Sequence, residues 1–280
     1  MANVPTKPTT PVKKESSSAS GLFASLTIPI CIVVAILIFV FILGDASHFK
    51  GGDTSATGTP ADIFGTVHKG GVIVPMIMSF LLMVIVFSIE RFVVIGKASG
   101  TGSVDSFVRK VQASLNAGNI AAASAECDKQ KGSVAAVIKS ALKKYAEMEA
   151  EPNLDVDQKT LAIQKDIEEA TALEMPMLEQ NLTIIATLVS IGTLTGLLGT
   201  VIGMIGAFST LAAAGAPNPS ELSSHISEAL INTALGISTS AISIIMYNVF
   251  TSKIDKLTYA IDETGFSIVQ TFAASHKNSR

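Results

Sequence analysis

The residues best suited to chemistry lie in two long apolar segments, which a carboxylate, an amide and several hydroxyl groups interrupt. In the second segment Asn232 and Thr239 follow Glu228 by four and eleven residues, a spacing that places all three on roughly one helical face. Ionisable and polar side chains are costly in lipid and usually face a bundle interior or a water-filled path. The pattern predicts that Glu228 and Asn232 line a polar pathway. The alternative for Glu228 is an acid that marks the end of a span near the membrane surface.

Two threonines could add hydroxyl groups to the same pathway. Thr200 lies in the first apolar segment, and Thr233 follows Asn232 in the second. Each hydroxyl could instead bond to the backbone carbonyl four residues earlier, as Ser and Thr side chains in helices often do. The residues by themselves leave both interpretations open.

A stripe of glycines runs along the first apolar segment. Spacings of four, three, four and three residues place its members on one helical face, where a second helix can approach closely. Plain helix packing is one interpretation, because small residues at such spacing are common in transmembrane helices. Together with the polar face of the next segment, the stripe predicts close-packed helices in an oligomer around a shared pathway. Its members are Gly192, Gly196, Gly199, Gly203 and Gly206.

No other kind of site is indicated by the sequence. The histidines are interpreted as isolated side chains without a catalytic or metal-ligating role; they are His48, His68, His225 and His276. The sequence contains no phosphate-binding glycine loop and no nucleophile elbow. Cys31 and Cys127 are predicted to be ordinary buried residues in different compartments, which cannot form a bridge. We therefore expect no enzyme activity, no metal site and no cofactor.

The composition is that of a membrane protein. Charged residues make up 15 % of the chain and the mean hydropathy is +0.49, whereas a soluble domain is about a quarter charged. Four apolar stretches are long enough to cross a bilayer; they are predicted at residues 25–45, 72–95, 182–214 and 222–250. The first is interpreted as an uncleaved anchor, because its apolar run exceeds a signal core and no clean cleavage site follows it. A cleaved signal peptide is the alternative. The predicted fold class is an all-α integral membrane protein with four transmembrane helices.

The segments between the spans are assigned to two sides of the membrane by their Lys and Arg content. Residues 1–24 are rich in Pro, Thr, Ser and Lys and are predicted to be a disordered cytoplasmic tail. Residues 96–181 and 251–280 are predicted to be cytoplasmic helices, because they hold nearly all the remaining basic residues. Residues 46–71 are expected to be a loosely structured periplasmic loop, and residues 215–221 a periplasmic turn.

Helical patterns continue beyond the spans. A break is predicted at Glu151-Pro152-Asn153, and a helix from Leu161 is expected to pass through Pro176 directly into the third span. The last helix is expected to begin with Asn218 as its N-cap and Pro219 at its first position. The last two spans are therefore expected to extend into a cytoplasmic helical bundle. An apolar rhythm continues the last helix through Ile254, Leu257, Ile261 and Ile268.

Three short stretches resemble the signatures of one family. Gly196-Leu197-Leu198-Gly199-Thr200-Val201-Ile202-Gly203-Met204 is similar to the GLFGTVWGIM-type motif of the MotA/TolQ/ExbB proton-channel family. The stretch ISEALINTALG, residues 226–236, is similar to its IAEALLATAIG motif. Glu90-Arg91-Phe92 ends the second span as an acid-Arg-aromatic trio does in that family. The resemblance covers roughly residues 72–250 and is strongest for the ExbB branch.

The resemblance implies a stator subunit of a motor driven by the proton-motive force in the bacterial inner membrane. In that family five copies surround the single transmembrane helices of two ExbD-like subunits, and proton flow drives a TonB-like protein that energises outer-membrane import. The protonatable Asp belongs to the ExbD-like partner. Thr200 and Thr233 match the family threonines that line the pore opposite that Asp, and Glu228 matches the pore-facing acid.

The chain also departs from the family pattern. Its first span has no counterpart in three-span members, and Thr193 and Ile242 stand where relatives have proline. The alternatives within the family are a TolQ-like envelope motor or another stator. From other classes, a non-conducting scaffold or a solute transporter is possible, although a transporter is expected to show inverted internal repeats that this sequence lacks.

Overall fold

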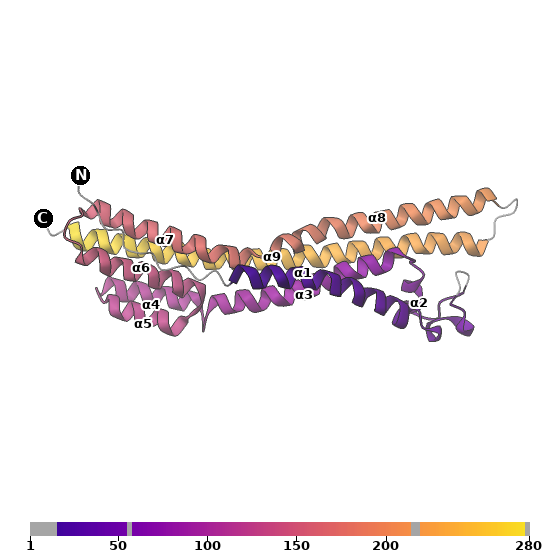
Figure 1. Cartoon of the computed structure of the whole chain (residues 1–280), viewed down its shortest axis with the longest axis horizontal. Helices are drawn as coiled ribbons and strands as arrows, with labels where there is room; N and C mark the ends of the chain where they lie inside the picture. The colour runs from indigo at the N-terminus through magenta and orange to yellow at the C-terminus, as the bar shows by residue number, and fades with distance from the viewer. Residues whose placement is uncertain (1–15, 55–57, 214–218, 278–280) are drawn as a thin grey trace.

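The computed structural model describes residues 16–54, 58–213 and 219–277, and these form a long molecule built of helices (Figure 1). Within these ranges no strand is present, and a single antiparallel bridge joins Phe49 to Pro60. Four helical segments are long and apolar enough to cross a membrane. The predicted all-α class and the four-span organisation are therefore confirmed, and the chain is a multi-pass membrane protein.

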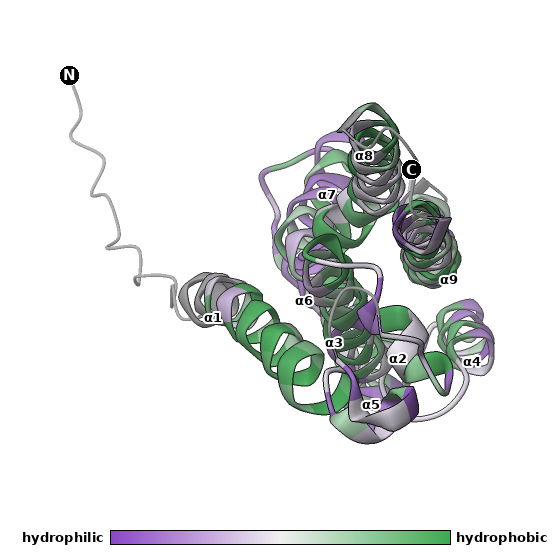
Figure 2. Cartoon of the chain, turned by 90° about the vertical axis from the view of Figure 1, so that its right-hand side faces the viewer, coloured by the Kyte–Doolittle hydropathy of each residue, from purple (hydrophilic) through white to green (hydrophobic). Residues whose placement is uncertain are grey.

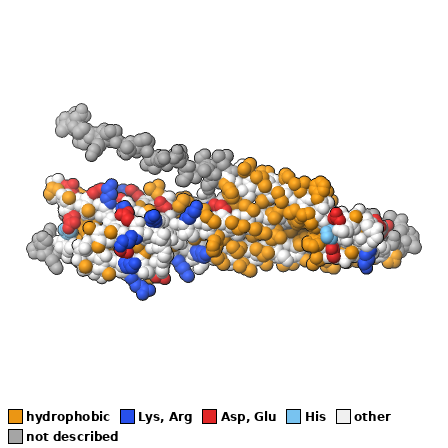
Figure 3. Space-filling model, turned by 90° about the horizontal axis from the view of Figure 1, so that it is seen from below, with side chains coloured by type: hydrophobic (Ala, Val, Ile, Leu, Met, Phe, Trp, Pro, Cys, Tyr) orange, Lys and Arg blue, Asp and Glu red, His pale blue; other side chains and the backbone are white. Residues whose placement is uncertain are grey.

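The molecule has a span half and a bundle half. Apolar side chains form a band over the span half, whereas Lys and Arg side chains gather over the bundle half (Figure 3). The span half contains α1 (Ser16–Leu37) with its π-helical continuation η1 (Ile38–Leu43), α3 (Ile73–Ser99), α8 (Leu182–Ala213) and the first part of α9 (Pro219–Lys277). The bundle half contains α4 (Val104–Asn116), α5 (Ile120–Gln130), α6 (Gly132–Ala150), α7 (Val156–Glu179) and the rest of α9.

The C-terminal part of α9 is a central element of the bundle half, because α4, α6 and α7 all pack against it. The residues of its predicted apolar rhythm are buried, with Ile254 at 4 % exposure and Ile268 at 0 %. Phe272 adds an edge-on contact with Tyr145, their ring centroids 4.9 Å apart. The repeated apolar residues of this long helix therefore lie in the core of the bundle half, as their periodicity predicts.

The expected continuous helix into the third span is wrong, because α7 ends at Glu179 and α8 begins at Leu182. Between them Asn181 adopts a left-handed backbone conformation, with φ of 61°, which ends a right-handed helix. Pro176 lies inside α7 as expected. The helix also begins earlier than expected, at Val156, because Asp155 forms a capping box with Gln158.

The segment predicted to be a loose loop, residues 46–71, is largely folded. It contains two 3-10 turns, η2 (Ala46–His48) and η3 (Lys50–Gly52), and the short helix α2 (Ile63–His68). Asp62 caps α2 by accepting a hydrogen bond of 3.0 Å from the backbone N–H of Gly65. His68 then stacks on Phe39 of η1, with ring centroids 4.5 Å apart. These caps and ring contacts give the segment a fixed shape that its Gly- and Thr-rich composition did not suggest.

The start of the first span differs from the prediction, whereas the start of the last helix agrees with it. Helix α1 begins at Ser16, so residues 16–24 are helical and not part of a disordered tail; residues 1–15 lie outside the described residues. Extending an existing helix costs little compared with starting one, so the apolar run carries the helix into the serine-rich segment. Helix α9 begins at Pro219 as expected, whereas the proposed cap Asn218 is not among the described residues.

The first span lies on the outside of the molecule, beside α3 (Figure 2). Its small residues Cys31 and Ala35 are buried, at 4 % and 0 % exposure, while Leu26 and Val33 are exposed. Both cysteines are buried and free, as predicted. Helix α1 therefore presents a small-residue face inward and an apolar face outward, as a lipid-facing span does.

Candidate functional site

The glycine stripe of α8 faces α9 of the same chain. A Cβ atom at Gly203 would lie 2.8 Å from the Cβ of Ala229, and one at Gly196 would lie 3.1 Å from the Cα of Gly236. Gly236 returns the contact from α9, because its own Cβ would lie 2.6 Å from the carbonyl oxygen of Gly192. Two helices that approach so closely have room for glycine and little else. The stripe therefore fixes the spacing of the α8–α9 pair within one protomer.

Thr200 and Thr233 meet across this helix pair, and their hydroxyl groups are hydrogen-bonded to each other. The Thr233 hydroxyl oxygen also lies 3.0 Å from the carbonyl oxygen of Ala229, and that of Thr200 lies 3.3 Å from the carbonyl oxygen of Gly196. Because each hydroxyl has one hydrogen, one of them donates to its carbonyl group while the other donates to its partner hydroxyl. Both side chains are half-buried. The back-bonding that sequence reasoning offered as the alternative is thus present together with the hydroxyl pair. Because a hydroxyl both donates and accepts, either threonine can exchange its partner for a water or a carboxyl group.

Glu228 and Asn232 lie on a different face of α9, toward the turn that precedes α3. The Asn232 side chain is fully buried, and its Nδ2 donates to the carbonyl oxygen of Gly70 at 2.8 Å. The Glu228 carboxylate rests against Gly71, where an added Cβ would collide with it. Gly71 has a φ of 72°, a conformation that glycine adopts at no steric cost. Both polar side chains are therefore held inside the protomer by the Gly70–Gly71 turn.

The predicted site residues thus form two groups and not one polar stripe. Thr239, predicted to share the face of Glu228, is buried at 1 % exposure and donates to the carbonyl oxygen of Leu235 at 2.9 Å. Thr200 and Thr233 lie at the α8–α9 contact, whereas Glu228 and Asn232 point toward the start of α3. Asn232 connects the groups, because its side chain also packs against the backbone of Gly199.

Two of the histidines interpreted as isolated have carboxylate neighbours. The Nδ1 atom of His225 lies 3.6 Å from Oε2 of Glu228, one helical turn away. His48 Nδ1 and Asp62 Oδ2 are hydrogen-bonded at 2.6 Å. The first pair has the i, i+3 spacing of neighbours on a helix and was visible in the sequence. The second joins residues that only the folded loop brings together.

Two other contacts near the site were missed by sequence reasoning. Thr193 donates to the hydroxyl oxygen of Ser240 at 2.8 Å and so joins α8 to α9. The Gly70–Gly71 turn receives Glu228 and Asn232, although the residues are more than 150 positions apart. A Gly-Gly pair at the start of a span was the available signal, since it permits a tight turn and close approach of another side chain.

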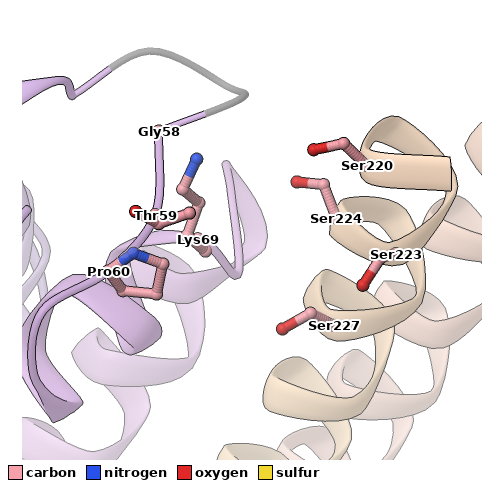
Figure 4. A pocket seen from close by; sticks show the side chains of 8 residues that line it. All are labelled: Gly58, Thr59, Pro60, Lys69, Ser220, Ser223, Ser224 and Ser227. Atoms are coloured by element: carbon pink, nitrogen blue, oxygen red, sulfur yellow. The ribbon is translucent and has the colours of Figure 1, made fainter. Parts of the chain in front are cut away.

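A cavity of about 210 Å³ opens at the end of the span half away from the bundle (Figure 4), and its lining residue Ser227 directly precedes Glu228 in the sequence. One wall is formed by residues 58–60 and Lys69, and the other by serines on the first turns of α9. Partial burial lowers the pKa of Lys69, while the nearby charge of Asp53 acts in the opposite direction. Lys69 Nζ also lies 5.9 Å from the ring centre of Phe49. The lining serines are Ser220, Ser223, Ser224 and Ser227.

No cluster of three or more His, Cys, Asp or Glu side chains within the described ranges could hold a metal ion. The groups present at the site are hydroxyl groups, an amide, the Glu228 carboxylate and the neighbouring His225 imidazole. All of them can order water, and the carboxylate and the imidazole can also exchange protons.

Residues 129–263 match the MotA/TolQ/ExbB proton channel family. The matched region contains the glycine stripe, both threonines, Glu228 and Asn232. This region, slightly under half of the chain, is similar to that family. The resemblance drawn from the two sequence motifs is thereby confirmed.

Curated relatives agree with this similarity. An ExbB-like protein of Synechocystis is 36 % identical over 88 residues, which cover 31 % of this chain and 42 % of the relative. The Tol-Pal system protein TolQ of Pseudomonas aeruginosa is 28 % identical over 121 residues, 43 % of this chain and 52 % of that protein. An ExbB homologue of Methanothermobacter thermautotrophicus is 26 % identical over 198 residues, 69 % of this chain and 66 % of the relative. The matches thus span from under half to about two thirds of these relatives.

Proposed function

We propose that this chain is an ExbB-like stator subunit of a motor driven by the proton-motive force in a bacterial inner membrane. With an ExbD-like single-span partner it forms a proton pathway that energises a TonB-like protein for outer-membrane import. Similarity to the MotA/TolQ/ExbB family supports a proton-channel stator role. The proposal also holds that the protein is not an enzyme and needs no cofactor.

The observation that carries the proposal is the hydroxyl pair of Thr200 and Thr233. The glycine stripe holds α8 and α9 so close that two short side chains from different helices reach each other. Both hydroxyl groups are half-buried, so a partner helix beside the α8–α9 contact can reach them. A carboxyl group on such a helix can exchange hydrogen bonds with the pair in its protonated and its ionised form. We propose that this exchange accompanies proton transfer along the pathway.

The apolar outer faces of α8 and α9 support an oligomer. Leu194 and Leu197 on α8 and Leu230 on α9 are 62 %, 56 % and 65 % exposed in one protomer. Such faces contact either lipid or another copy of the chain. We propose a homopentamer around the single-span helices of two ExbD-like subunits.

The proposed orientation places the bundle half and both termini in the cytoplasm. Lys and Arg side chains gather on the bundle half (Figure 3), and basic residues favour the cytoplasmic side of a bacterial inner membrane. The folded segment of residues 46–71, the cavity and the start of α9 then lie on the periplasmic side.

A TolQ-like role is the second candidate, because TolQ of Pseudomonas aeruginosa matches 43 % of the chain. The two roles are separated by the phenotype of a deletion strain. Loss of an ExbB-like stator reduces uptake of outer-membrane import substrates, whereas loss of a TolQ-like motor makes the envelope leaky to detergent.

The proposed function is tested with the complex purified from native membranes in mild detergent. Its mass and subunit composition report the number of copies and the presence of a single-span subunit with an intramembrane Asp. Reconstitution into liposomes that contain a pH-sensitive dye then measures proton entry under an imposed gradient. We expect a flux above that of empty liposomes and above that of the Thr200→Ala complex. A complex without a single-span subunit and without proton flux would leave a scaffold as the better account.

A further inference from the structure

The cavity lined by Ser227 has a continuous polar wall on α9. The four lining serines lie within eight residues, at positions that cover one side of the first two turns of the helix. In Figure 4 the hydroxyl groups of Ser224 and Ser227 and the amine of Lys69 point into the space between α9 and the segment of residues 58–60. A cavity of about 210 Å³ with serine hydroxyl groups along one wall is large enough to hold several water molecules and offers them hydrogen-bond partners.

Polar groups continue from this cavity toward the middle of the span. Glu228 follows Ser224 by four residues and therefore lies one turn deeper on a neighbouring line of α9. Its side chain is 23 % exposed, and its carboxylate rests against Gly71, two residues after the cavity-lining Lys69. The Nδ1 atom of His225 on α9 lies 3.6 Å from the carboxylate, and Lys69 before α3 lines the cavity. Glu228 is thus the first ionisable side chain of α9 beyond the cavity.

The next polar residue along the same face has an unpaired acceptor. Asn232 is fully buried, and its Nδ2 is bonded to Gly70, but within the described residues its Oδ1 has no hydrogen-bond donor. A buried acceptor without a donor is costly. A protonated Glu228 one turn away, or a water molecule between the two, supplies the kind of donor that this oxygen needs. The orphan oxygen therefore favours a hydrated, proton-exchanging site at Glu228.

We propose that the cavity is an aqueous vestibule through which protons reach Glu228 from the side of the membrane opposite the bundle half. This proposal rests on the proposed proton-channel function and names the entrance for that function. In the vestibule a hydronium ion gives one proton to the Glu228 carboxylate, so that a neutral carboxylic acid and one water molecule result.

The first span anchors one of the two walls of this entrance. The wall residues 58–60 are tied to Phe49 by the bridge between Phe49 and Pro60. Phe49 packs edge-on against His68, which stacks on Phe39 at the end of the first span. The first span therefore anchors the segment that encloses the vestibule.

The proposal is tested by cysteine accessibility in the assembled complex. The background carries Cys31→Ala and Cys127→Ala, and single variants Ser224→Cys and Ser227→Cys are treated with a membrane-impermeant, positively charged thiosulfonate applied to each side separately. A thiol reacts as its thiolate in contact with water, so both positions are expected to be labelled, from the side opposite the bundle half, about tenfold faster than a lipid-facing cysteine. The control is Val33→Cys, on the apolar outer face of α1, where Val33 is 55 % exposed.

Proton flux provides the second readout. A fixed positive charge in a narrow cavity repels hydronium, so labelled Ser227→Cys complexes are expected to conduct about tenfold less than the same complexes before labelling. The reagent should leave the flux of the Val33→Cys complex unchanged. Failure to label Ser224→Cys and Ser227→Cys, or labelling with unchanged flux, would overturn the vestibule.

The two proposals fail in different ways. If the unlabelled complexes conduct no protons, the proposed function fails, and rapid labelling would then show a water-filled cavity with no role in conduction, which also overturns the vestibule. If flux is present and Thr200→Ala abolishes it, while a labelled Ser227→Cys complex conducts normally, the proposed function stands and the vestibule alone is wrong.

Discussion

Arg91 on α3 donates a hydrogen bond of 3.2 Å from its guanidinium group to the carbonyl oxygen of Leu178, near the end of α7. The same nitrogen donates to the carbonyl oxygen of Met177 at 3.0 Å. The last carbonyl groups of a helix have no partner within the helix, and a cation near them is favoured by the helix dipole. Arg91 is 1 % exposed and is also paired with Glu90. It therefore joins the second span to the point where the bundle half passes into α8.

We predict that Arg91→Gln destabilises the junction between α7 and α8. Removing the guanidinium group leaves the partly buried Glu90 with the weaker 3.4 Å hydrogen bond from Asn181. The cost should therefore stay below the roughly 3–5 kcal/mol that breaking a fully buried ion pair causes. Thermal unfolding of the purified complex should occur at a clearly lower temperature, and amide hydrogen exchange should increase around residues 177–185. The unfolding temperature of Arg91→Lys is expected to lie between those of the wild type and Arg91→Gln, because an ammonium group lacks the planar fork of donors of a guanidinium group. Lys97→Gln, an exposed change on the same helix, is the control; equal stability of the two Gln variants would contradict this account.

The glycine stripe leads to a prediction about assembly. Gly199→Leu and Gly203→Leu should prevent stable assembly, because a side chain at either position would enter Asn232 or Ala229 of α9 and force the helices apart. Even Gly203→Ala is expected to cost about 1–3 kcal/mol, as overpacking of a tight contact does. Gly96 is the matched control, since a Cβ there meets no other atom within 4 Å. Size-exclusion chromatography in detergent measures the oligomer mass of each variant and so tests this prediction. Normal oligomer mass for both Leu variants would rule out a tight α8–α9 contact.

Periodic features of the fold could be predicted from the sequence, whereas features that depend on distant contacts could not. The apolar length of the spans and the spacing of Ile254 and Ile261 are local patterns. The structure has four long apolar helices, and both isoleucines are buried. The break at Asn181 could not be found locally, because Arg91, more than 80 positions away, supplies hydrogen bonds to the end of α7. A sequence that lacks a breaker residue at that point favours continuation of the helix.

In the candidate site, too, features set by helical periodicity could be predicted, whereas features set by distant contacts could not. The α8 glycines were placed correctly on one helical face, and Thr200 and Thr233 could be named from their motifs. The direction in which Asn232 points could not be predicted. It depends on a hydrogen bond to the carbonyl oxygen of Gly70, in the turn before α3. Helical spacing gives the relative angle of two residues on one helix. It does not say which neighbouring helix that angle faces.

The threonine pair yields a prediction about coupling. Thr200→Ala and Thr233→Ala should assemble normally yet lose transport activity, because each change removes one hydroxyl from the pair and leaves the helices in place. One hydrogen bond contributes about 1 kcal/mol, so a loss of about fivefold or more is expected in proton flux. Thr→Ser at either position keeps the hydroxyl and should retain most of the flux. Thr187→Ala is the control, because the Thr187 hydroxyl bonds only within its own helix, to Thr183 at 2.7 Å. Wild-type flux in both Ala variants would make the pair structural.

Cys127 is predicted to be inert toward thiol reagents in the folded protein. Burial raises its pKa to about 12, with a smaller contribution from the charge of Asp128. A raised pKa keeps the thiol protonated, so at pH 8 only about one molecule in ten thousand carries the reactive thiolate. Alkylation at pH 8 should be negligible in membranes and rapid after denaturation. Ala125→Cys, an exposed position on the same helix, should react at once. Fast native labelling of Cys127 would show that α5 opens readily.

Glu228 is expected to carry a proton during transport. Glu228→Gln keeps the shape that rests against Gly71 and keeps hydrogen bonding, but the amide cannot take up and release a proton at neutral pH. The complex should therefore assemble while proton flux falls by about 100-fold, the scale on which loss of a positioned proton carrier acts. Glu228→Leu should be at least as inactive, since it also removes the polar contact beside Asn232.

Two further variants separate the charge of Glu228 from its position. Glu221→Gln changes an exposed acid in the first turn of the same helix and should conduct normally. Gly71→Ala keeps the acid but places a Cβ where its carboxylate rests, at a backbone φ of 72° that alanine adopts poorly. It should therefore displace the carboxylate and reduce flux although Glu228 is intact. If Glu228→Gln conducts like the wild type while Gly71→Ala does not, the carboxylate serves to brace the Gly70–Gly71 turn. Thr200 and Thr233 would then remain as the pathway residues.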